Sequence, residues 1–385
     1  MARLKYWVWL SCIGGVRPIA KYRLAEALGG PERIFFAGEK ELSSVDGVSP
    51  GEVKRLLDKS MEPASRVLSF CEEHHITILT MQDAAYPERL RNIPDPPVVL
   101  YIWGKLPPVD ECAAIAVVGT RNATPYGLKM ASKMGRELAQ NGAVVVSGLA
   151  AGCDSAAMEA ALLAGGISIG VLGTAIDEVY PAKNRPLFED VKARGALVSE
   201  YAPGMRTYPA DFKARNRIIT GLSLGVVVAE APSRSGTRNT VEHALEQGRD
   251  VFAIPGNADA AACAGCNDLL SQGAIVALGG ADVLREYGHR FDLVSPKTAD
   301  IPIKKEIDKP KDIVYIDHID NTEEMKTLPT AQRKVLQVMT RPDMHADEII
   351  EAAGLTAPET LAALTMLQVT GWVAQGAGKR YTRKK

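Results

Sequence analysis

Seven apolar runs between residues 113 and 288 constrain the fold of this 385-residue chain more than any other feature. In chain order they are AIAVVG, AVVVSG, ISIGVLG, ALVSE, LGVVVAEA, DVFAIPG and AIVALGG. Segments with helical periodicity, such as GLKMASKMGRELAQNG and TRNTVEHALEQG, alternate with them. Apolar runs without a polar face are typical of strands buried on both sides, and their alternation with helices indicates a mainly parallel sheet. We therefore predict an α/β fold with a Rossmann-like core over residues 113–290.

A small helical domain is predicted before this core, over residues 1–65. The stretches IGGVRP (13–18) and VDGVSP (45–50) share one pattern, and each leads into an amphipathic segment. A glycine turn that opens a helix, used twice, is typical of paired helix-hairpin-helix (SAM-like) units, whose turn N–H groups can hold a DNA phosphate. A helical bundle that packs only on its neighbour fits the same pattern, so both interpretations stay open.

Three further segments complete the predicted organisation. Residues 66–112 combine a helical pattern, the strand-like ITILT and many prolines, and are predicted to be a connecting extension. Residues 291–328 are rich in Lys, Asp and Pro and are predicted to be a linker. Residues 329–385 contain three helical patterns followed by WVAQGAGKRYT, which predicts a hairpin. We therefore expect a C-terminal winged helix, a domain that binds either DNA or protein.

Composition and missing motifs exclude several classes of function. The net charge of -1 means that any contact with nucleic acid requires a local patch of Lys and Arg. Scattered cysteines and the lack of a long apolar run favour a cytoplasmic protein without a membrane span, and Cys263 and Cys266 form a lone CxxC that does not predict a metal. The chain contains no GxGxxG, GxxxxGK[ST], HExxH or GxSxG. Binding of NAD or ATP and the common hydrolase mechanisms are therefore not expected.

The candidate site lies in the loops that follow the apolar runs, because ligands of open α/β sheets bind beyond the carboxyl ends of the strands. These loops are rich in Gly, Ser, Thr and Arg, which suits anionic oxygen. They are GTRNAT (119–124), SGLAAGCD (147–154), GTAIDEVYPAKN (173–184), SEYAPG (199–204), EAPSRSGT (230–237) and IPGN (254–257). The isolated carboxylates Asp154, Glu200 and Glu230 are predicted to be helix caps or partners of arginines.

The segment FKARNRIITGLS (212–223) adds a group of cations at the rim of this crevice. It contains Lys213, Arg215 and Arg217 together with Asn216. Cations at an anion-binding crevice are costly to leave unpaired, so we expect them to contact the ligand. Solvated arginines, or salt bridges to the nearby glutamates, are the structural alternative.

The ordered motifs closely resemble those of the DNA-processing protein A (DprA, or Smf) family. They are VVGTRNATPYG, VVVSGLAAGCDSAAMEAAL, GVLGTAIDEVYPAKN, LVSEY, FKARNRIITGLS, VVVAEAPSRSGT and RDVFAIPGN. The resemblance implies a non-catalytic protein that needs no cofactor and binds single-stranded DNA in the crevice of its Rossmann-like domain. It also implies a homodimer that protects incoming single strands and loads the RecA recombinase during natural transformation.

The resemblance also implies which residues contact DNA. By position they are Gly119, Thr120, Arg121, Ser147, Gly148, Lys183, Asn184, Lys213, Arg215, Asn216, Arg217, Ser235, Gly236 and Thr237. Ala151, Cys153 and Met158 depart from the family, which usually has arginine, isoleucine and histidine there. We expect these departures to move the DNA path rather than abolish binding. Aromatic residues beside the loops offer faces for stacking bases, namely Tyr126, Tyr180, Tyr201, Tyr208 and Phe212.

Two other functions remain as alternatives. Phosphoribohydrolases of the lysine-decarboxylase-like type carry PGGxGTxxE at an equivalent strand end. Here Ser235-Gly236-Thr237 lacks the glycine pair, and the nearest following glutamate is Glu242, which is too far along. A protein-interaction scaffold is the third interpretation, and it predicts no salt-sensitive binding of DNA.

Overall fold

The computed structural model describes residues 3–288, 290–291, 328–339, 344–375 and 380–383. The chain divides into two compact units, Met1–Asp300 and Ile301–Lys385, which we describe separately. Most of the predicted linker, residues 292–327, lies outside the described residues.

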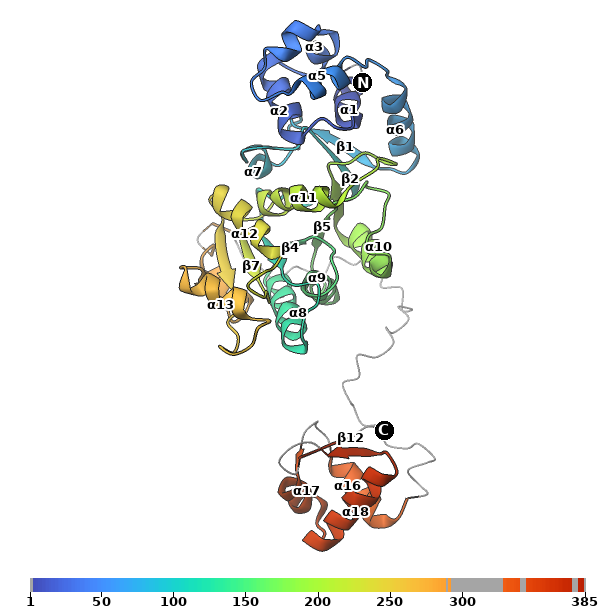
Figure 1. Ribbon diagram of the computed structural model, residues 1–385, viewed down its shortest axis with the longest axis vertical. Coiled ribbons are helices and arrows are strands. Elements are labelled where there is room, and N and C mark those ends of the chain that lie inside the picture. Colours follow the sequence, from blue (N-terminus) through green and yellow to red (C-terminus); the bar gives the residue numbers. More distant parts are fainter. Residues whose placement is uncertain (1–2, 289, 292–327, 340–343, 376–379, 384–385) are drawn as a thin grey trace. The chain divides into compact units, whose positions relative to one another are not determined.

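A nine-stranded sheet forms the centre of the first unit, in the order β1-β2-β6-β5-β4-β3-β7-β8-β9 (Figure 1). Its strands are β1 (Thr77–Thr80), β2 (Val99–Gly104), β3 (Ala114–Val118), β4 (Val144–Ser147), β5 (Ser168–Val171), β6 (Ala196–Ser199), β7 (Gly225–Val228), β8 (Asp250–Ala253) and β9 (Ile275–Val276). Strands β3 to β9 are parallel, whereas β2 is antiparallel to both β1 and β6. The predicted apolar runs supply β3 to β9, which confirms the mainly parallel α/β core.

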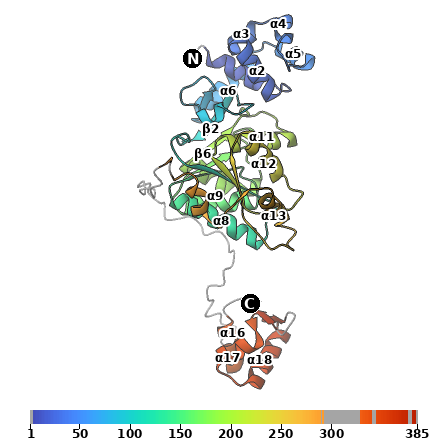
Figure 2. The same cartoon turned by 90° about the vertical axis from the view of Figure 1, so that its left-hand side faces the viewer.

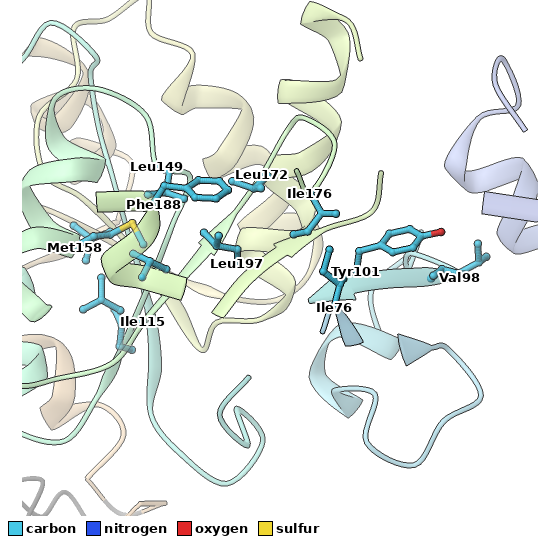
Figure 3. Close-up of a cluster of buried hydrophobic side chains, with 14 of the residues drawn as sticks. Ile76, Val98, Tyr101, Ile115, Leu149, Met158, Leu172, Ile176, Phe188 and Leu197 are labelled. Carbon is cyan, nitrogen blue, oxygen red and sulfur yellow. The ribbon is translucent and has the colours of Figure 1, made fainter. Parts of the chain in front are cut away.

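Two helical layers cover the sheet because successive strand residues point to opposite faces. Ile115 and Val117 of β3 pack with one layer, and Ala114 and Ala116 pack with the other. The first layer contains α8 (Pro125–Gln140), α9 (Cys153–Leu163), α10 (Arg185–Arg194) and α14 (Gly280–Arg285), and the second contains α7 (Glu88–Arg91), α11 (Pro209–Gly221), α12 (Thr237–Glu246) and α13 (Ala264–Ser271). Figures 1 and 2 show α8 and α9 across the sheet from α11 and α12. Figure 3 shows part of the hydrophobic core between the sheet and the first layer, which includes Ile115, Met158 and Leu197.

The N-terminal helices lie beside the β1–β2 edge of the sheet (Figure 1). They are α1 (Leu4–Cys12), α2 (Pro18–Leu28), α3 (Pro31–Phe36), α4 (Glu39–Ser43), α5 (Pro50–Leu56) and α6 (Glu62–Glu73). Gly15 between α1 and α2 has φ +74°, and Gly47 between α4 and α5 has φ +79°, a conformation that favours glycine. Arg55 of α5 lies against Gly15, and Arg23 of α2 lies against Gly47. The sequence repeat therefore folds as two helix-hairpin-helix units that pack on each other reciprocally.

The second unit has the predicted winged-helix elements. They are α16 (Thr330–Val338), β10 (Met344–His345), α17 (Ala346–Ala353), α18 (Ala357–Val369), β11 (Val373–Gln375) and β12 (Arg380–Arg383). The strands form an antiparallel sheet in the order β10-β12-β11. Its core contains Leu336, Ile349 and Leu364, one from each helix. Among the described residues of the whole chain, no helix combines the length and apolar character that crossing a membrane requires.

Candidate functional site

The winding of the sheet reverses between β3 and β7, the place where an α/β sheet is expected to bind a ligand. Glu230, which follows β7, fills this point with its own carboxylate. Its oxygens accept hydrogen bonds from Thr124 N at 2.8 Å and Thr124 Oγ1 at 2.5 Å, at the start of α8. A Cβ atom at Gly127 would collide with this carboxylate. The N-cap of α8 is Thr124, whose hydroxyl accepts from Gly127 N at 3.2 Å, and Glu230 holds this capping residue in place rather than capping the helix itself. Its carboxylate therefore occupies the space in front of the start of α8.

A cavity of about 150 Å³ opens next to this point. We call it the strand-end cavity because residues after β3, β4 and β5 line it together with residues of α11. The lining residues are Arg121, Gly148, Ala150, Ala151, Tyr180, Pro181, Phe212 and Arg215. This lining contains two arginines and no carboxylate, histidine or cysteine.

Arg215 is the buried cation of the strand-end cavity, with 5% of its surface exposed. Its Nη1 donates to the carbonyl oxygen of Gly148 at 2.9 Å and also to that of Val171, so it ties the ends of β4 and β5 together. Burial lowers the pKa of Arg215 to about 10, although the nearby carboxylate of Asp154 favours the charged form. The guanidinium therefore remains charged at pH 7.

Arg121 is an exposed arginine on the same cavity. Burial is the main cause of the lowered pKa of Arg215, and the nearby charge of Arg121 lowers it further. In the part of the chain that the structure describes, no carboxylate forms an ion pair with Arg121. Two guanidinium groups on one cavity repel each other, and an anion held between them would replace this repulsion with two attractions. The cavity is therefore suited to a phosphate.

Aromatic side chains stand beside these arginines. The ring centroids of Tyr180 and Phe212 are 5.1 Å apart with an interplanar angle of 58°, and 51% of Tyr180 is exposed. Base stacking requires an accessible π-face of this kind. Both residues were predicted from the sequence to stack bases, but their position beside Arg121 and Arg215 was not predicted.

The loop after β4 is held in one shape by several contacts. Leu149 has φ +55°, and its side chain is anchored in the core beside Phe188 (Figure 3). The Nδ2 atom of Asn184 donates to the carbonyl oxygen of Leu149 at 2.8 Å. A Cβ atom at Gly152, where φ is +86°, would lie 2.8 Å from the carbonyl oxygen of Arg121. The wall of the cavity is therefore preorganised, with the loops after β3, β4 and β5 in mutual contact.

The predicted residues Arg217 and Ser147 do not face the strand-end cavity. Arg217 is 1% exposed, and its guanidinium pairs with Glu200 and Asp95 at 2.9 Å each. Burial lowers the pKa of Arg217, but these two carboxylates outweigh it and raise the pKa above the usual value. Ser147 is fully buried and donates its hydroxyl to the carbonyl oxygen of Val117 at 2.6 Å. Arg217 thus follows the salt-bridge alternative of the sequence analysis.

Most of the other predicted residues surround the cavity without lining it. Gly119 allows close packing of Cys153, and Thr120 accepts a backbone hydrogen bond from Cys153 at 3.3 Å. Lys183 and Lys213 are exposed. The amide of Asn216 accepts from Nε of Arg215 at 3.2 Å and donates to Asn239 at 3.1 Å.

The Ser235-Gly236-Thr237 turn lies at the start of α12, outside the cavity lining. Thr237 N donates to the hydroxyl of Ser235 at 3.2 Å, which stabilises the turn locally. Asn239, in the same helix, connects α12 to the cavity through Asn216 and Arg215. Ala150 and Pro181 line the cavity; both lie in predicted site loops, but neither was among the residues predicted to contact DNA. Only their positions after β4 and β5 could have indicated them.

Metal chemistry has no candidate ligand set in the described residues. No group of three or more His, Cys, Asp or Glu side chains is arranged there to hold an ion. Cys263 and Cys266 are both buried free thiols, and burial raises the pKa of each.

Comparison with known proteins gives matches over both units. A family model described as DNA recombination-mediator protein A matches residues 77–288, and one described as DprA winged helix domain matches residues 322–379. Protein Smf of Synechocystis is 33% identical over 98% of this chain and 98% of its own length. DNA processing protein DprA of Streptococcus pneumoniae is 44% identical over 53% of this chain and 72% of its own length.

Two solved structures are also similar. The X-ray structure of DprA from Streptococcus pneumoniae has a TM-score of 0.64 and 35% identity, covering 73% of this chain and 97% of its own. A structure of DNA processing protein A from Helicobacter pylori, reported for its single-stranded DNA binding mode, has a TM-score of 0.51 and 29% identity. It covers 57% of this chain and 99% of its own.

Proposed function

Because this chain belongs to the DNA recombination-mediator protein A family, also called DprA or Smf, we propose that it binds single-stranded DNA at the strand-end cavity. The observation that carries the proposal is the pair of guanidinium groups, Arg121 and Arg215, on one cavity without a carboxylate. A phosphate lies between them, and bases stack on Tyr180 and Phe212. The Helicobacter pylori relative, reported as a single-stranded DNA binder, supports the choice of ligand.

The exposed cations near the cavity extend the contact to neighbouring phosphates. Lys183 lies beside Asn184, whose amide holds the loop after β4, and Lys213 lies on the exposed side of α11. The backbone around Gly119, Thr120 and Gly148, and the Ser235–Thr237 turn, complete the proposed surface. Arg217 and Ser147 contribute indirectly, because both are buried and hold the strand ends in place.

The role we propose is that of a recombination mediator without catalytic activity. The protein protects incoming single-stranded DNA in the cytoplasm and loads the RecA recombinase onto it during natural transformation. It acts as a homodimer through its core domain, and the exposed Val276 and Leu278 at the β9 edge support a contact there. The family description supports mediation of recombination.

Fluorescence anisotropy of a labelled single strand of about 40 nucleotides tests this proposal. Binding should weaken with salt at a slope near -0.7 per phosphate contact, and a duplex of equal length should bind less tightly. Equal or weaker binding of the single strand relative to the duplex contradicts the proposal. Release of free base from AMP would instead favour the phosphoribohydrolase alternative.

A further inference from the structure

A large groove of the first unit lies between the N-terminal helices and the core, and the proposed function does not use it. Its volume is about 910 Å³, several times that of the strand-end cavity. The α1–α2 turn, helices α5 and α6, and the segment 200–211 before and within α11 line it. We call it the hairpin groove. Figure 1 shows these N-terminal helices at the β1–β2 end of the sheet.

Cations outnumber carboxylates in the lining of the hairpin groove. The cationic residues are Arg17, Lys21, Arg55, Arg66 and Arg206, and the carboxylates are Asp177, Glu200 and Asp211. Each carboxylate already has a partner. Asp177 accepts from Gly204 N at 3.0 Å, Glu200 pairs with Arg217 at 2.9 Å, and Asp211 accepts from Tyr208 N at 2.6 Å.

Three of the five cations have no ion pair in the described residues. Arg17 pairs with Glu52 at 2.9 Å, and Arg66 pairs with Glu62. Arg55 and Arg206 are exposed and Lys21 is buried, and none of the three forms a salt bridge within the part of the chain described. They exceed by one the two lining carboxylates, Asp177 and Asp211, whose partners are uncharged backbone N–H groups, so the groove is weakly positive.

Lys21 is the observation that points most directly to an anionic ligand. It is 7% exposed, and its ammonium donates one hydrogen bond, to the carbonyl oxygen of Ser11 at 2.8 Å. An ammonium has three donors, and burial of a charge with unused donors is costly. Burial lowers the pKa of Lys21 to about 8, although the nearby carboxylate of Glu200 favours the charged form, so the group is still mainly charged at pH 7. A phosphate oxygen in the groove would accept from the unused donors.

The two hairpins of the repeat differ in their access to the groove. Gly14 and Gly15 of the first turn line it and are exposed. In the second turn, the carbonyl oxygen of Gly47 accepts a hydrogen bond from Arg17 at 2.7 Å, and no residue of this turn lines the groove. Only the first hairpin therefore presents its backbone, beside Arg55, to a ligand in the groove.

The hairpin groove and the strand-end cavity are lined by neighbouring residues at the start of α11. Tyr208 and Asp211 line the groove, and the next residue, Phe212, lines the cavity. The guanidinium of Arg206 lies over the ring of Tyr208, 5.4 Å from its centroid. A chain that leaves the cavity across Phe212 and Tyr208 thus enters the groove beside Arg206.

We propose that the hairpin groove holds the continuation of the single DNA strand bound in the strand-end cavity, with its phosphates against Lys21, Arg55 and Arg206. This inference rests on the proposed function, because it extends the same ligand. It assigns the N-terminal domain a direct part in binding DNA, and it makes the bound length of strand longer than the cavity alone can cover.

A length series of single strands, from about 6 to about 40 nucleotides, tests this inference with the full chain. For the wild type, affinity should rise with length until both sites are filled. In the variant Arg55→Ala with Arg206→Ala, long strands should bind about tenfold more weakly, with a salt slope shallower by about 1.4, while the shortest strands that bind keep their affinity. The variant should also reach its plateau at a shorter length.

The matched control is Arg23→Ala with Arg136→Ala. Arg23 is the repeat equivalent of Arg55 but lies against Gly47, and Arg136 is exposed on α8 and lines neither the groove nor the cavity. Equal losses in the two double variants would overturn the inference, because they would reflect net charge alone. Unchanged binding by Arg55→Ala with Arg206→Ala, while Arg121→Ala loses affinity, would overturn the inference and leave the proposed function intact. If the wild type bound no single-stranded DNA, both the inference and the proposed function would be overturned.

Discussion

The strand-end cavity and the hairpin groove each contain a buried cation, but the two cations are held differently. Arg215 donates to two backbone carbonyls and lies near Asp154, whereas Lys21 donates to one carbonyl. Burial lowers both pKa values, to about 10 for Arg215 and to about 8 for Lys21. A planar guanidinium with five donors can be fixed by the protein and still offer donors to a ligand. The cavity is therefore the more rigid site, and we expect it to supply more of the affinity than the groove.

Replacing Arg217 gives the largest expected effect, which is on stability. This arginine is buried in ion pairs and offers no free charge to a ligand in either region. Its partner Glu200 also lines the hairpin groove. Arg217→Ala should lower the free energy of unfolding by about 3–5 kcal/mol, since Glu200 and Asp95 would be left without their buried partner. Urea unfolding measures this change. Arg238→Ala, at an exposed site, should stay within about 0.5 kcal/mol of the wild type.

A small loss in Arg217→Ala, together with weakened binding of DNA, would contradict this assignment. Arg217 would then be a ligand contact like Arg215, as the family resemblance implied. The two arginines would have the same role despite their different partners.

Replacing Arg121 and Lys183 gives the next largest effect, which is on the affinity for single-stranded DNA. This variant tests whether the strand-end cavity supplies most of that affinity. The double variant Arg121→Ala with Lys183→Ala should bind a single strand of about 40 nucleotides more than tenfold more weakly, which corresponds to about 1.4 kcal/mol or more. Its salt slope should be shallower by about 1.4, because two phosphate contacts are lost. Anisotropy titrations across salt measure both quantities. Stability should be nearly unchanged, since both side chains are exposed.

The control for this variant is Lys129→Ala with Arg136→Ala, which removes the same charge from exposed positions on α8. If the control loses as much affinity as Arg121→Ala with Lys183→Ala, the strand-end cavity is not a specific binding site for DNA. If the groove variant Arg55→Ala with Arg206→Ala loses more affinity than Arg121→Ala with Lys183→Ala, the order of the two regions is reversed.

The strands of the core were predictable because strands buried on both faces leave a continuous apolar run. Each run from 113 to 288 became one of the parallel strands β3 to β9. Strand β2 was not predicted, because the prolines around residues 94–108 suggested irregular structure. Its sequence VLYIWG is nevertheless apolar, and it pairs with β6 at the end of the parallel set.

The loops that form the site were predictable from the sequence, but the direction in which each side chain points was not. Arg215 and Arg217 are two positions apart on α11, and side chains with this spacing do not share a helix face. Arg215 thus reaches the strand ends, whereas Arg217 reaches Glu200 and Asp95. From the sequence, the two arginines were predicted together with Lys213 as one group of cations at the rim of the crevice, without separating the faces of a helix. The position of Asp95, far away in sequence, carried no signal of this pairing.

Lys21 gives the smallest expected effect and tests the weaker of the two sites. Its pKa is about 8 in the folded protein and 10.5 at its ordinary value, so charging it costs free energy in the folded state. Lys21→Met should therefore raise the free energy of unfolding at pH 7, by about 1 kcal/mol, because part of the gain is offset when the carbonyl of Ser11 loses its donor. Urea unfolding at several pH values measures the change.

The pH dependence of this gain follows from the direction of the shift. Below pH 8 the lysine is protonated in both states, so the cost is present in full. Between about pH 8 and 10.5 the folded protein releases this proton before the unfolded chain does, and the wild type becomes more stable with rising pH through this group. The advantage of Lys21→Met should accordingly shrink over this range. Lys54→Met, at an exposed position of α5, should show no such difference.

Binding completes the test of Lys21, because a residue kept at a cost to stability is expected to have a function. Lys21→Met should bind long single strands about threefold more weakly, since one phosphate contact is lost, while short strands that fill only the strand-end cavity bind as before. A variant that is more stable yet binds long strands as well as the wild type would contradict the role of Lys21 in the groove. The buried ammonium would then lack the ligand that its unused donors indicate, and the hairpin groove would not be a DNA site in the way the strand-end cavity is.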